Sequence, residues 1–140
     1  VIQAEDCAQP SIYVWEPEAD AQVTRSAPSF TITCSFQATC TSFSESSAGC
    51  IYLGVKSFSP AQYLVLSIRP GHKLVRLERQ VDGESKVVVE KTDRNLRNNS
   101  YHSLVLYVSG STLNLTMDGR EVLESVQCDA GELLGLVGVG

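Results

Sequence analysis

The sequence predicts an all-β fold in which two antiparallel sheets pack against each other as a sandwich. Apolar and polar residues alternate strictly in some stretches, as in Ser29–Gln37, and successive side chains of a strand point to opposite faces of its sheet. Turn dipeptides, among them Ser109-Gly110 and Asp118-Gly119, separate such stretches at short intervals. Several short strands with regular turn signals are typical of a sandwich or barrel.

The most regular pattern is a predicted three-stranded meander over residues 101–123. A two-residue turn at Ser109-Gly110 would gather the leucines on one face in two cross-strand pairs, Leu106 with Leu113 and Leu104 with Leu115. The opposite face then receives the polar side chains of Ser103, Asn114 and Thr116. Register and hydrophobic pattern therefore agree, as a half-buried hairpin requires. Asp118-Gly119 suits the second turn of the meander.

A second hairpin is predicted over residues 62–69 and 72–79, around Pro70-Gly71. It would pair Leu66 with Val75 and Leu64 with Leu77. For the connection that follows, a two-residue turn at Asp82-Gly83 would pair core-facing with solvent-facing residues. A three-residue loop, Val81-Asp82-Gly83, pairs Leu77 with Val87 and keeps the faces separate, so the pattern favours the longer loop.

The rest of the chain is expected to form one β-sandwich domain over residues 1–140. Residues 1–10 read as a polar lead-in, and residues 92–100 as a polar crossover. Further strands are predicted at residues 11–15, 29–37, 50–55 and 132–139, which brings the total to about ten. A chain of 140 residues is long enough for one domain with a hydrophobic core.

Charge and hydropathy exclude several classes of partner. The formal net charge is -5, which argues against nucleic acid or an anionic membrane as the main ligand. No apolar run is long enough to span a bilayer, and no signal peptide opens the chain. Val1 reads as a processing boundary, so a leader could have been removed.

The cysteines and sequons favour a secreted protein or the extracellular part of a larger one. Five cysteines occur without any C-x-x-C spacing, and there are only two histidines, so a zinc site is not expected. Two N-x-S/T sequons begin at Asn98 and Asn114. A disulfide from Cys40 to Cys50 would tie down the Ser/Thr-rich loop that these two residues bracket.

No catalytic or cofactor motif is evident, so the chain is not expected to be an enzyme. A nucleophile elbow, a phosphate-binding glycine loop and paired carboxylates are all lacking from the sequence. His72 lies beside a turn, and His102 is expected to be a packed structural residue. The candidate calcium ligands Asp82, Asp93 and Asp118 form no D-x-D cluster, so no cofactor is expected.

Residues 101–119 resemble the late strands of a laminin G-like domain. There an aromatic-His pair opens a strand, aliphatic residues alternate, and a second strand ends in Asp-Gly; here Tyr101 stands where Trp is usual. The matched residues are Tyr101, His102, Leu104, Leu106, Val108, Leu113, Leu115, Asp118 and Gly119. The resemblance implies the jelly-roll sandwich that laminin G-like and galectin-like domains share. The matched residues are structural in these families and imply no binding site.

The resemblance also bears on the disulfides. Chain ends in jelly-roll sandwiches usually lie close together, which favours a bond between Cys7 and Cys128, with Cys40–Cys50 as the second. Cys34 would then be the free thiol, on the inward face of its strand. The rival pairing Cys34–Cys50 would leave Cys40 free in an exposed loop.

The candidate ligand-binding residues lie on the solvent face of the second hairpin: Arg69, His72, Arg76 and Glu78. Galectins use a His-x-Asn-x-Arg strand to bind sugar, and the corresponding stretch here begins at His72 and ends at Arg76 but has Leu74 in place of the Asn. A galactose site of that design is therefore not expected. The resulting function is a protein-binding module of an adhesion or matrix protein or of a secreted adhesin complex. The alternative is a lectin-like glycan-binding module.

Overall fold

The computed structural model describes residues 13–15, 29–37, 49–97, 99–133 and 135–140, which form an all-β fold as predicted. Their strands are β1 (Tyr13–Trp15), β2 (Ser29–Gln37), β3 (Gly49–Phe58), β4 (Ala61–Arg69), β5 (Leu74–Val81), β6 (Glu84–Thr92), β7 (Tyr101–Ser109), β8 (Thr112–Met117), β9 (Arg120–Gln127) and β10 (Leu136–Val139). A 3-10 turn (Pro70–His72) and the one-turn helix α1 (Ala130–Leu133) complete the described elements. None of the helices in these residues has the length and apolarity to cross a membrane.

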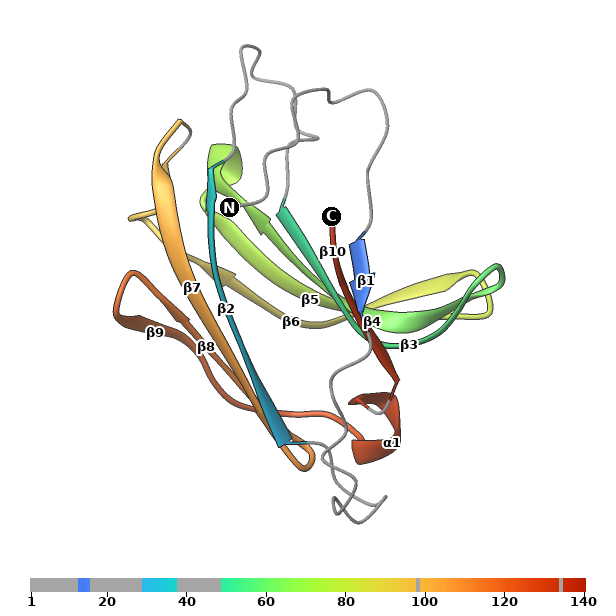
Figure 1. The fold of residues 1–140 in the computed structure, drawn as a ribbon. Helices are drawn as coiled ribbons and strands as arrows, with labels where there is room; N and C mark the ends of the chain where they lie inside the picture. Colours follow the sequence, from blue (N-terminus) through green and yellow to red (C-terminus); the bar gives the residue numbers. More distant parts are fainter. Residues whose placement is uncertain (1–12, 16–28, 38–48, 98, 134) are drawn as a thin grey trace.

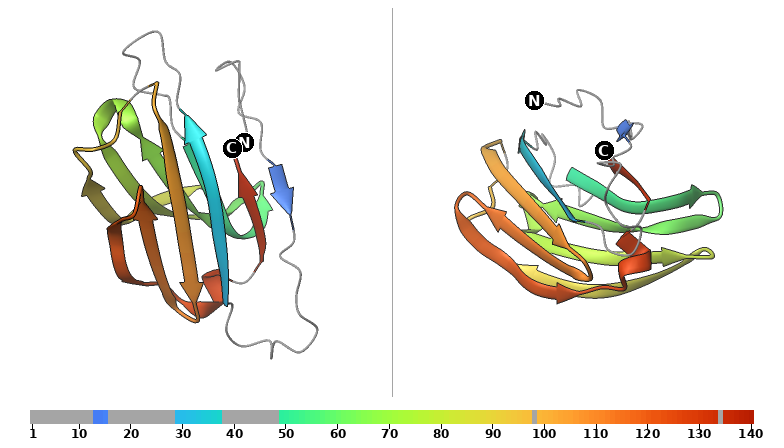
Figure 2. Two further views of the ribbon diagram at one scale, coloured as in Figure 1. Left: turned by 60° about the vertical axis from the view of Figure 1, so that its left-hand side comes forward. Right: turned by 60° about the horizontal axis from the view of Figure 1, so that its bottom comes forward.

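The strands form two antiparallel sheets that face each other (Figure 1). The six-stranded sheet has the order β1-β10-β3-β4-β5-β6, and the four-stranded sheet has the order β2-β7-β8-β9. Figure 2 shows the two layers from two further directions, with α1 at one end of the sandwich. The predicted two-sheet antiparallel sandwich is therefore confirmed.

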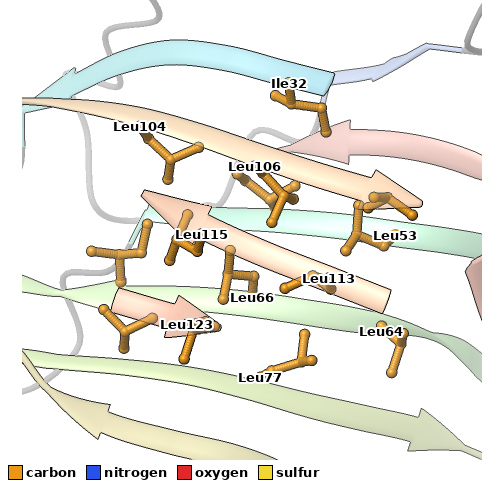
Figure 3. Close-up of a cluster of buried hydrophobic side chains, with 14 of the residues drawn as sticks. Ile32, Leu53, Leu64, Leu66, Leu77, Leu104, Leu106, Leu113, Leu115 and Leu123 are labelled. Carbon is orange, nitrogen blue, oxygen red and sulfur yellow. The ribbon is translucent and has the colours of Figure 1, made fainter. Parts of the chain in front are cut away.

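The core consists of aliphatic side chains that both sheets contribute to the space between them (Figure 3). Among the fully buried ones are Leu53, Leu64, Leu66, Leu77, Leu104, Leu106, Leu113, Leu115 and Leu123. Burying such a side chain stabilises the fold by about 1.5–3 kcal/mol. Along β7 and β8 they alternate with exposed or half-buried residues, which is why the sequence pattern identified them.

Two predicted registers are wrong by two residues, although their faces are right. In the β7–β8 hairpin Leu106 pairs with Leu115, and Leu104 with Met117, because the turn occupies Gly110-Ser111 instead of Ser109-Gly110. The β4–β5 hairpin pairs Leu66 with Leu77. Its connection is the 3-10 turn followed by Lys73 in a left-handed conformation (φ 53°). A shift of two residues leaves every side chain on the same face, so the core assignment survived both errors.

The β5–β6 connection is the two-residue turn that the pattern disfavoured. Asp82 and Gly83 have φ values of 51° and 80°, as a primed hairpin turn requires. The extra residue that the hydrophobic pattern demands lies inside β6: Glu78 pairs with Val87 but Leu77 pairs with Val89, so Val88 forms a bulge. The predicted three-residue loop is therefore wrong. The bulge at Val88, rather than the loop, keeps core-facing residues of β5 paired with core-facing residues of β6.

The C-terminal segment is also more complex than the predicted strand over residues 132–139. It forms α1 and then β10, which inserts between β1 and β3. The backbone of α1 lies against β3 at Gly54: a Cβ atom there would come within 1.7 Å of the Glu132 carbonyl oxygen, and the φ of Gly54 is +58°. Only glycine fits both the conformation and the space. The predicted lead-in, residues 1–10, lies outside the described residues.

Candidate functional site

The candidate site is the outer face of the six-stranded sheet, defined here by the side chains of β3 to β6 that point away from the four-stranded sheet. The register aligns these side chains in rows across the strands. One row contains Cys50, Ser67, Arg76 and Glu90; the next contains Tyr52, Val65, Glu78 and Val87. Their chain neighbours Ile51, Leu66 and Leu77 point into the core, so alternation places the rows on the outer face.

Charged side chains from both rows form a network. The Nε of Arg76 donates to Glu90 Oε2 at 2.7 Å, and its Nη1 lies 3.4 Å from Glu78 Oε1. The hydrogen bond from Arg76 to Glu90 raises the pKa of the guanidinium, an effect that both carboxylates reinforce. Two carboxylates therefore hold this guanidinium in place and balance its charge.

Three aromatic rings pack together beside this network. The ring centroid of Tyr52 lies 5.2 Å from that of Tyr63 and 6.0 Å from that of Phe58, and the Phe58 and Tyr63 centroids are 5.5 Å apart. Phe58 is 44 % exposed. Burial, followed by the nearby Cys50 and Tyr63, raises the pKa of Tyr52 to about 12, so its phenol stays neutral and can donate a hydrogen bond at neutral pH.

Small residues occupy the centre of the outer face. Val65 is 8 % exposed and Ser67 is 4 % exposed, although both point away from the core. The register places Val65 between Tyr52 and Glu78. The Ser67 hydroxyl donates to the Arg76 carbonyl at 3.4 Å. The centre of this face therefore has small side chains flanked by aromatic and charged ones.

Three of the four predicted ligand-binding residues lie on this face. Arg76 and Glu78 belong to the charged network, and Arg69 is at the end of β4. Arg69 forms no ion pair with any described residue, and its Nε atom is shielded from solvent without a hydrogen-bond partner. His72 lies apart from them, exposed in the 3-10 turn.

Sequence reasoning missed four members of the outer face: Cys50, Tyr52, Phe58 and Glu90. Glu90 was missed because the predicted loop placed Val88, rather than Glu90, opposite Arg76. Cys50 is half-buried and forms no disulfide with another described cysteine. Burial raises its pKa, while the charge of Arg69 and a hydrogen bond with Tyr52 act in the opposite direction.

A second polar cluster centres on His102, which is 4 % exposed. Its Nδ1 lies 2.7 Å from Asp118 Oδ2, and its Nε2 accepts a hydrogen bond from the Arg97 backbone N–H at 3.1 Å. We assign the proton to Nδ1, since this satisfies both contacts. Both ring nitrogens are thus engaged by the protein, and His102 is the packed structural histidine that the sequence predicted.

Asp93, one of the candidate calcium ligands, is engaged by neighbouring donors. Its Oδ1 accepts hydrogen bonds from Arg120 Nη1 at 2.7 Å and from the Asn95 backbone at 3.0 Å. Burial tends to raise the pKa of Asp93, but these bonds outweigh it and lower the pKa. Burial and hydrogen bonds oppose each other in the same way at Asp118, where bonds from His102 and the Ser103 N–H lower the pKa. Among the described residues, no three His, Cys, Asp or Glu side chains are grouped as a metal site would need.

The predicted modification sites are described only in part. Cys34, Cys50 and Cys128 form no disulfide with one another, whereas their predicted partners Cys7 and Cys40, and also Asn98, lie outside the described residues. The pairings Cys7–Cys128 and Cys40–Cys50 therefore stay predictions. Asn114 is half-exposed on the outer side of β8, where its Oδ1 accepts a hydrogen bond from the Ser125 N–H at 2.8 Å. Glycosylation at its Nδ2 is compatible with this bond and also stays a prediction.

A groove of about 430 Å³ opens between the edge strands β6 and β9. Its apolar lining comes from Val89, Val122, Leu123 and Val126, and its charged lining from Lys91, Glu121 and Glu124. It lies apart from the predicted ligand-binding residues, and it is lined by the free margins of the two sheets.

No family model and no curated protein matches the chain, but solved structures do. Carbohydrate-binding module CBM66 from Bacillus subtilis aligns with a TM-score of 0.66 and 17% identity, over 79% of this chain and 65% of that chain. This chain thus spans slightly less than two thirds of that module. Sheep galectin-11 in complex with glycerol aligns with a TM-score of 0.67 and 8% identity, over 94% of this chain and 91% of that one. A human galectin-16 variant aligns with a TM-score of 0.64 and 11% identity, over 81% and 84% of the two chains.

Identities this low establish the architecture and nothing more. The fold of this chain is the jelly-roll sandwich of galectin-like and laminin G-like domains, as the resemblance in residues 101–119 implied.

Proposed function

We propose that this chain is a non-enzymatic carbohydrate-binding module that holds its ligand on the outer face of the six-stranded sheet. The observation that carries the proposal is the position of the aromatic cluster Tyr52, Phe58 and Tyr63 beside the network of Arg76, Glu78 and Glu90. Two structures with this fold, a carbohydrate-binding module and a galectin with glycerol bound, support the same function.

Sugar chemistry matches these two groups of side chains. A pyranose ring has an apolar C–H surface, which stacks on aromatic rings, and a rim of hydroxyls, which need paired donors and acceptors. The half-exposed ring of Phe58 and the neighbouring tyrosines supply apolar surface with polar tips. Arg76 and its carboxylates supply donors and acceptors whose positions are set before the ligand arrives, which reduces the entropic cost of binding.

A protein-binding function is the second candidate, and the outer face of the four-stranded sheet favours it. Tyr101, Val105 and Tyr107 are 56 %, 37 % and 45 % exposed there. Aromatic residues at this exposure are typical of protein interfaces. Either function suits the secreted or extracellular location that the cysteines and sequons predict, within an adhesion or matrix protein or an adhesin complex. Neither needs a cofactor.

A glycan array probed with the folded domain separates the two functions. We expect selective binding that the free sugar competes away. Binding should be lost with Tyr63→Ala and retained with the matched control Tyr107→Ala, which removes the same ring from the other sheet. Array binding that no free sugar competes, or that both variants reduce equally, would rule out the proposed site. If the array stays blank while the domain captures a protein through the Tyr107 face, the second function holds instead.

A further inference from the structure

We infer that the preferred ligand of the outer face is an oligosaccharide that bears a carboxylate, and that Arg69 is the residue that receives it. The inference rests on the proposed function, since it names the class of ligand for the same face.

The first argument is the charge balance on this face. Arg76 has two carboxylate partners, Glu78 and Glu90. Arg69 lies on the same face, two positions after Ser67, and has no carboxylate within ion-pair distance among the described residues. Its Nε is withdrawn from solvent and makes no hydrogen bond to a described residue. A buried donor without a partner is uncommon in native structures and needs an explanation. A ligand that supplies the missing acceptor is such an explanation.

The second argument is the geometry of the guanidinium. A carboxylate can accept two parallel hydrogen bonds from one edge of this group, and that edge includes Nε. Nε is withdrawn from solvent, but the Arg69 side chain as a whole is half-exposed, so the guanidinium would turn outward to make this contact. The contact would then satisfy the unpartnered Nε and balance the charge of Arg69. A neutral sugar hydroxyl could accept the hydrogen bond from Nε but could not balance the charge. The chemistry of this position therefore favours an acidic sugar over a neutral one.

The third argument is distance along the strand. Tyr63 and Arg69 are six residues apart on β4 and point to the same side, so they are separated by about 20 Å at the usual rise of a strand. This separation exceeds the size of one sugar ring. A ligand that contacts both the aromatic cluster and Arg69 must therefore contain several sugars, with the acidic one at the Arg69 end.

The test is an array in which each glycan backbone is present in neutral, carboxylated and sulfated form. The probes are the unaltered domain, Arg69→Met, Arg69→Lys and the control Lys86→Gln. The control removes one positive charge at an exposed site on β6, on the side of the sheet opposite the candidate face. We expect carboxylated members to bind about tenfold or more above their neutral counterparts. Arg69→Met should abolish that preference, Arg69→Lys should keep part of it, and Lys86→Gln should leave it unchanged.

Thermal unfolding of each variant distinguishes a binding role from a structural one. Arg69→Met should keep the melting temperature of the unaltered domain, since Arg69 makes no ion pair with a described residue. A large fall in melting temperature would assign Arg69 a structural role and overturn the inference. Equal binding of neutral and carboxylated members would overturn it while leaving the proposed function intact, and so would a preference confined to sulfated members. An array to which the unaltered domain does not bind would overturn both.

Discussion

The outer faces of the two sheets differ, although both belong to strands with one side in the same core. Along β7 burial alternates strictly, and Val105 and Tyr107 are exposed between the buried Leu104, Leu106 and Val108. Along β4 five consecutive residues from Leu64 to Ile68 are buried. The outward-facing side chains of Val65 and Ser67 on the central strand β4 are thus buried, whereas those of Val105 and Tyr107 on β7 are open to solvent.

This difference shows that an alternating sequence pattern identifies a strand whose outer face is exposed to solvent, but not a strand whose outer face is also buried. A strand with one face in water shows the polar residues that solvent demands. On β4 the outer side instead has Val65 and Ser67 beside large neighbours. The small side chains of Val65 and Ser67 are shielded by the larger aromatic and charged side chains around them. A ligand that rests on these larger side chains can exclude water, and the proposed site lies there.

Core substitutions give the largest expected effect and test the alternation directly. Leu106→Ala and Leu115→Ala should each lower the free energy of unfolding by about 2–5 kcal/mol, because both side chains are fully buried. Val105→Ala, one position away, should change it by less than about 0.5 kcal/mol. Urea denaturation midpoints measure all three. Midpoints unchanged by both leucine variants would contradict the face assignment of β7.

The ion pair between Asp93, directly after β6 in one sheet, and Arg120, at the start of β9 in the other, tests how the two sheets are held together. Because the pKa of Asp93 is lowered by folding, its contribution is fully present above the unfolded value of about 4 and is lost as the pH falls through the folded value. Asp93→Asn should therefore reduce stability at pH 7, by about 1–3 kcal/mol. The variant should also lose less of its stability than the unaltered domain between pH 5 and about pH 2.

Chemical denaturation of both proteins at each pH measures this difference. The control is Asp82→Asn, since Asp82 is exposed in the β5–β6 turn. Parallel stability curves for Asp93→Asn and the unaltered domain would contradict the role of Asp93.

The covered outer face of β4 predicts an effect of intermediate size. Val65→Ala should cost about 1–2 kcal/mol, since Val65 is 8 % exposed and loses two buried methyl groups. The same change at Val105 on β7 should cost far less, as stated above. Equal effects at the two valines would mean that the two outer faces do not differ in cover.

The charged network should contribute little to stability. A double-mutant cycle of Arg76→Ala and Glu90→Ala should give a coupling energy of about 0.2–1 kcal/mol, because the two side chains are 25 % and 44 % exposed. Both variants should nevertheless weaken glycan binding on the array. A coupling energy well above this range would assign the pair a structural role instead of a binding one.

Glycosylation should have the smallest effect. Expression in a secretory pathway should add a glycan to Asn114, whose side chain is on the open outer face of the four-stranded sheet. We expect the melting temperature to stay within the error of measurement when the glycan is removed enzymatically. Mass spectrometry of the peptide determines occupancy, and an unmodified Asn114 in protein secreted through that pathway would contradict the prediction.

The sequence predicted the sandwich, the core leucines and their faces, since a period of two is insensitive to register errors of two residues. It did not predict the exact turns, because a turn at Ser109-Gly110 and a turn at Gly110-Ser111 both place the leucines of β7 and β8 on the same face. The β5–β6 hairpin shows the limit most clearly. The pattern required one extra residue, but the position of that residue, in the turn or in the strand, depends on how β6 packs on β5.

That single uncertainty also limited the prediction of the site. Placing the extra residue in the turn put Val88 opposite Arg76 and hid the ion pair with Glu90, whereas the bulge brings the two side chains to 2.7 Å. Phe58 was missed because β3 extends three residues beyond the predicted stretch 50–55. Tyr52 lies within that stretch, but its residues (CIYLGV) do not alternate between apolar and polar, so the pattern does not show which face Tyr52 is on. Arg69, Arg76 and Glu78 were found because they follow the alternation of an unbulged hairpin.

The placement of β10 has a consequence for the order of folding. β10 lies between β1 and β3, and hydrogen bonds link Cys50 to Gly140 in both directions, at 2.8 and 2.9 Å. Strands from opposite ends of the sequence must therefore meet late, since this side of the six-stranded sheet cannot assemble on the ribosome until residues 136–140 emerge. Until then β3 has an unpaired edge, and nascent chains are open to wrong strand pairing at that edge.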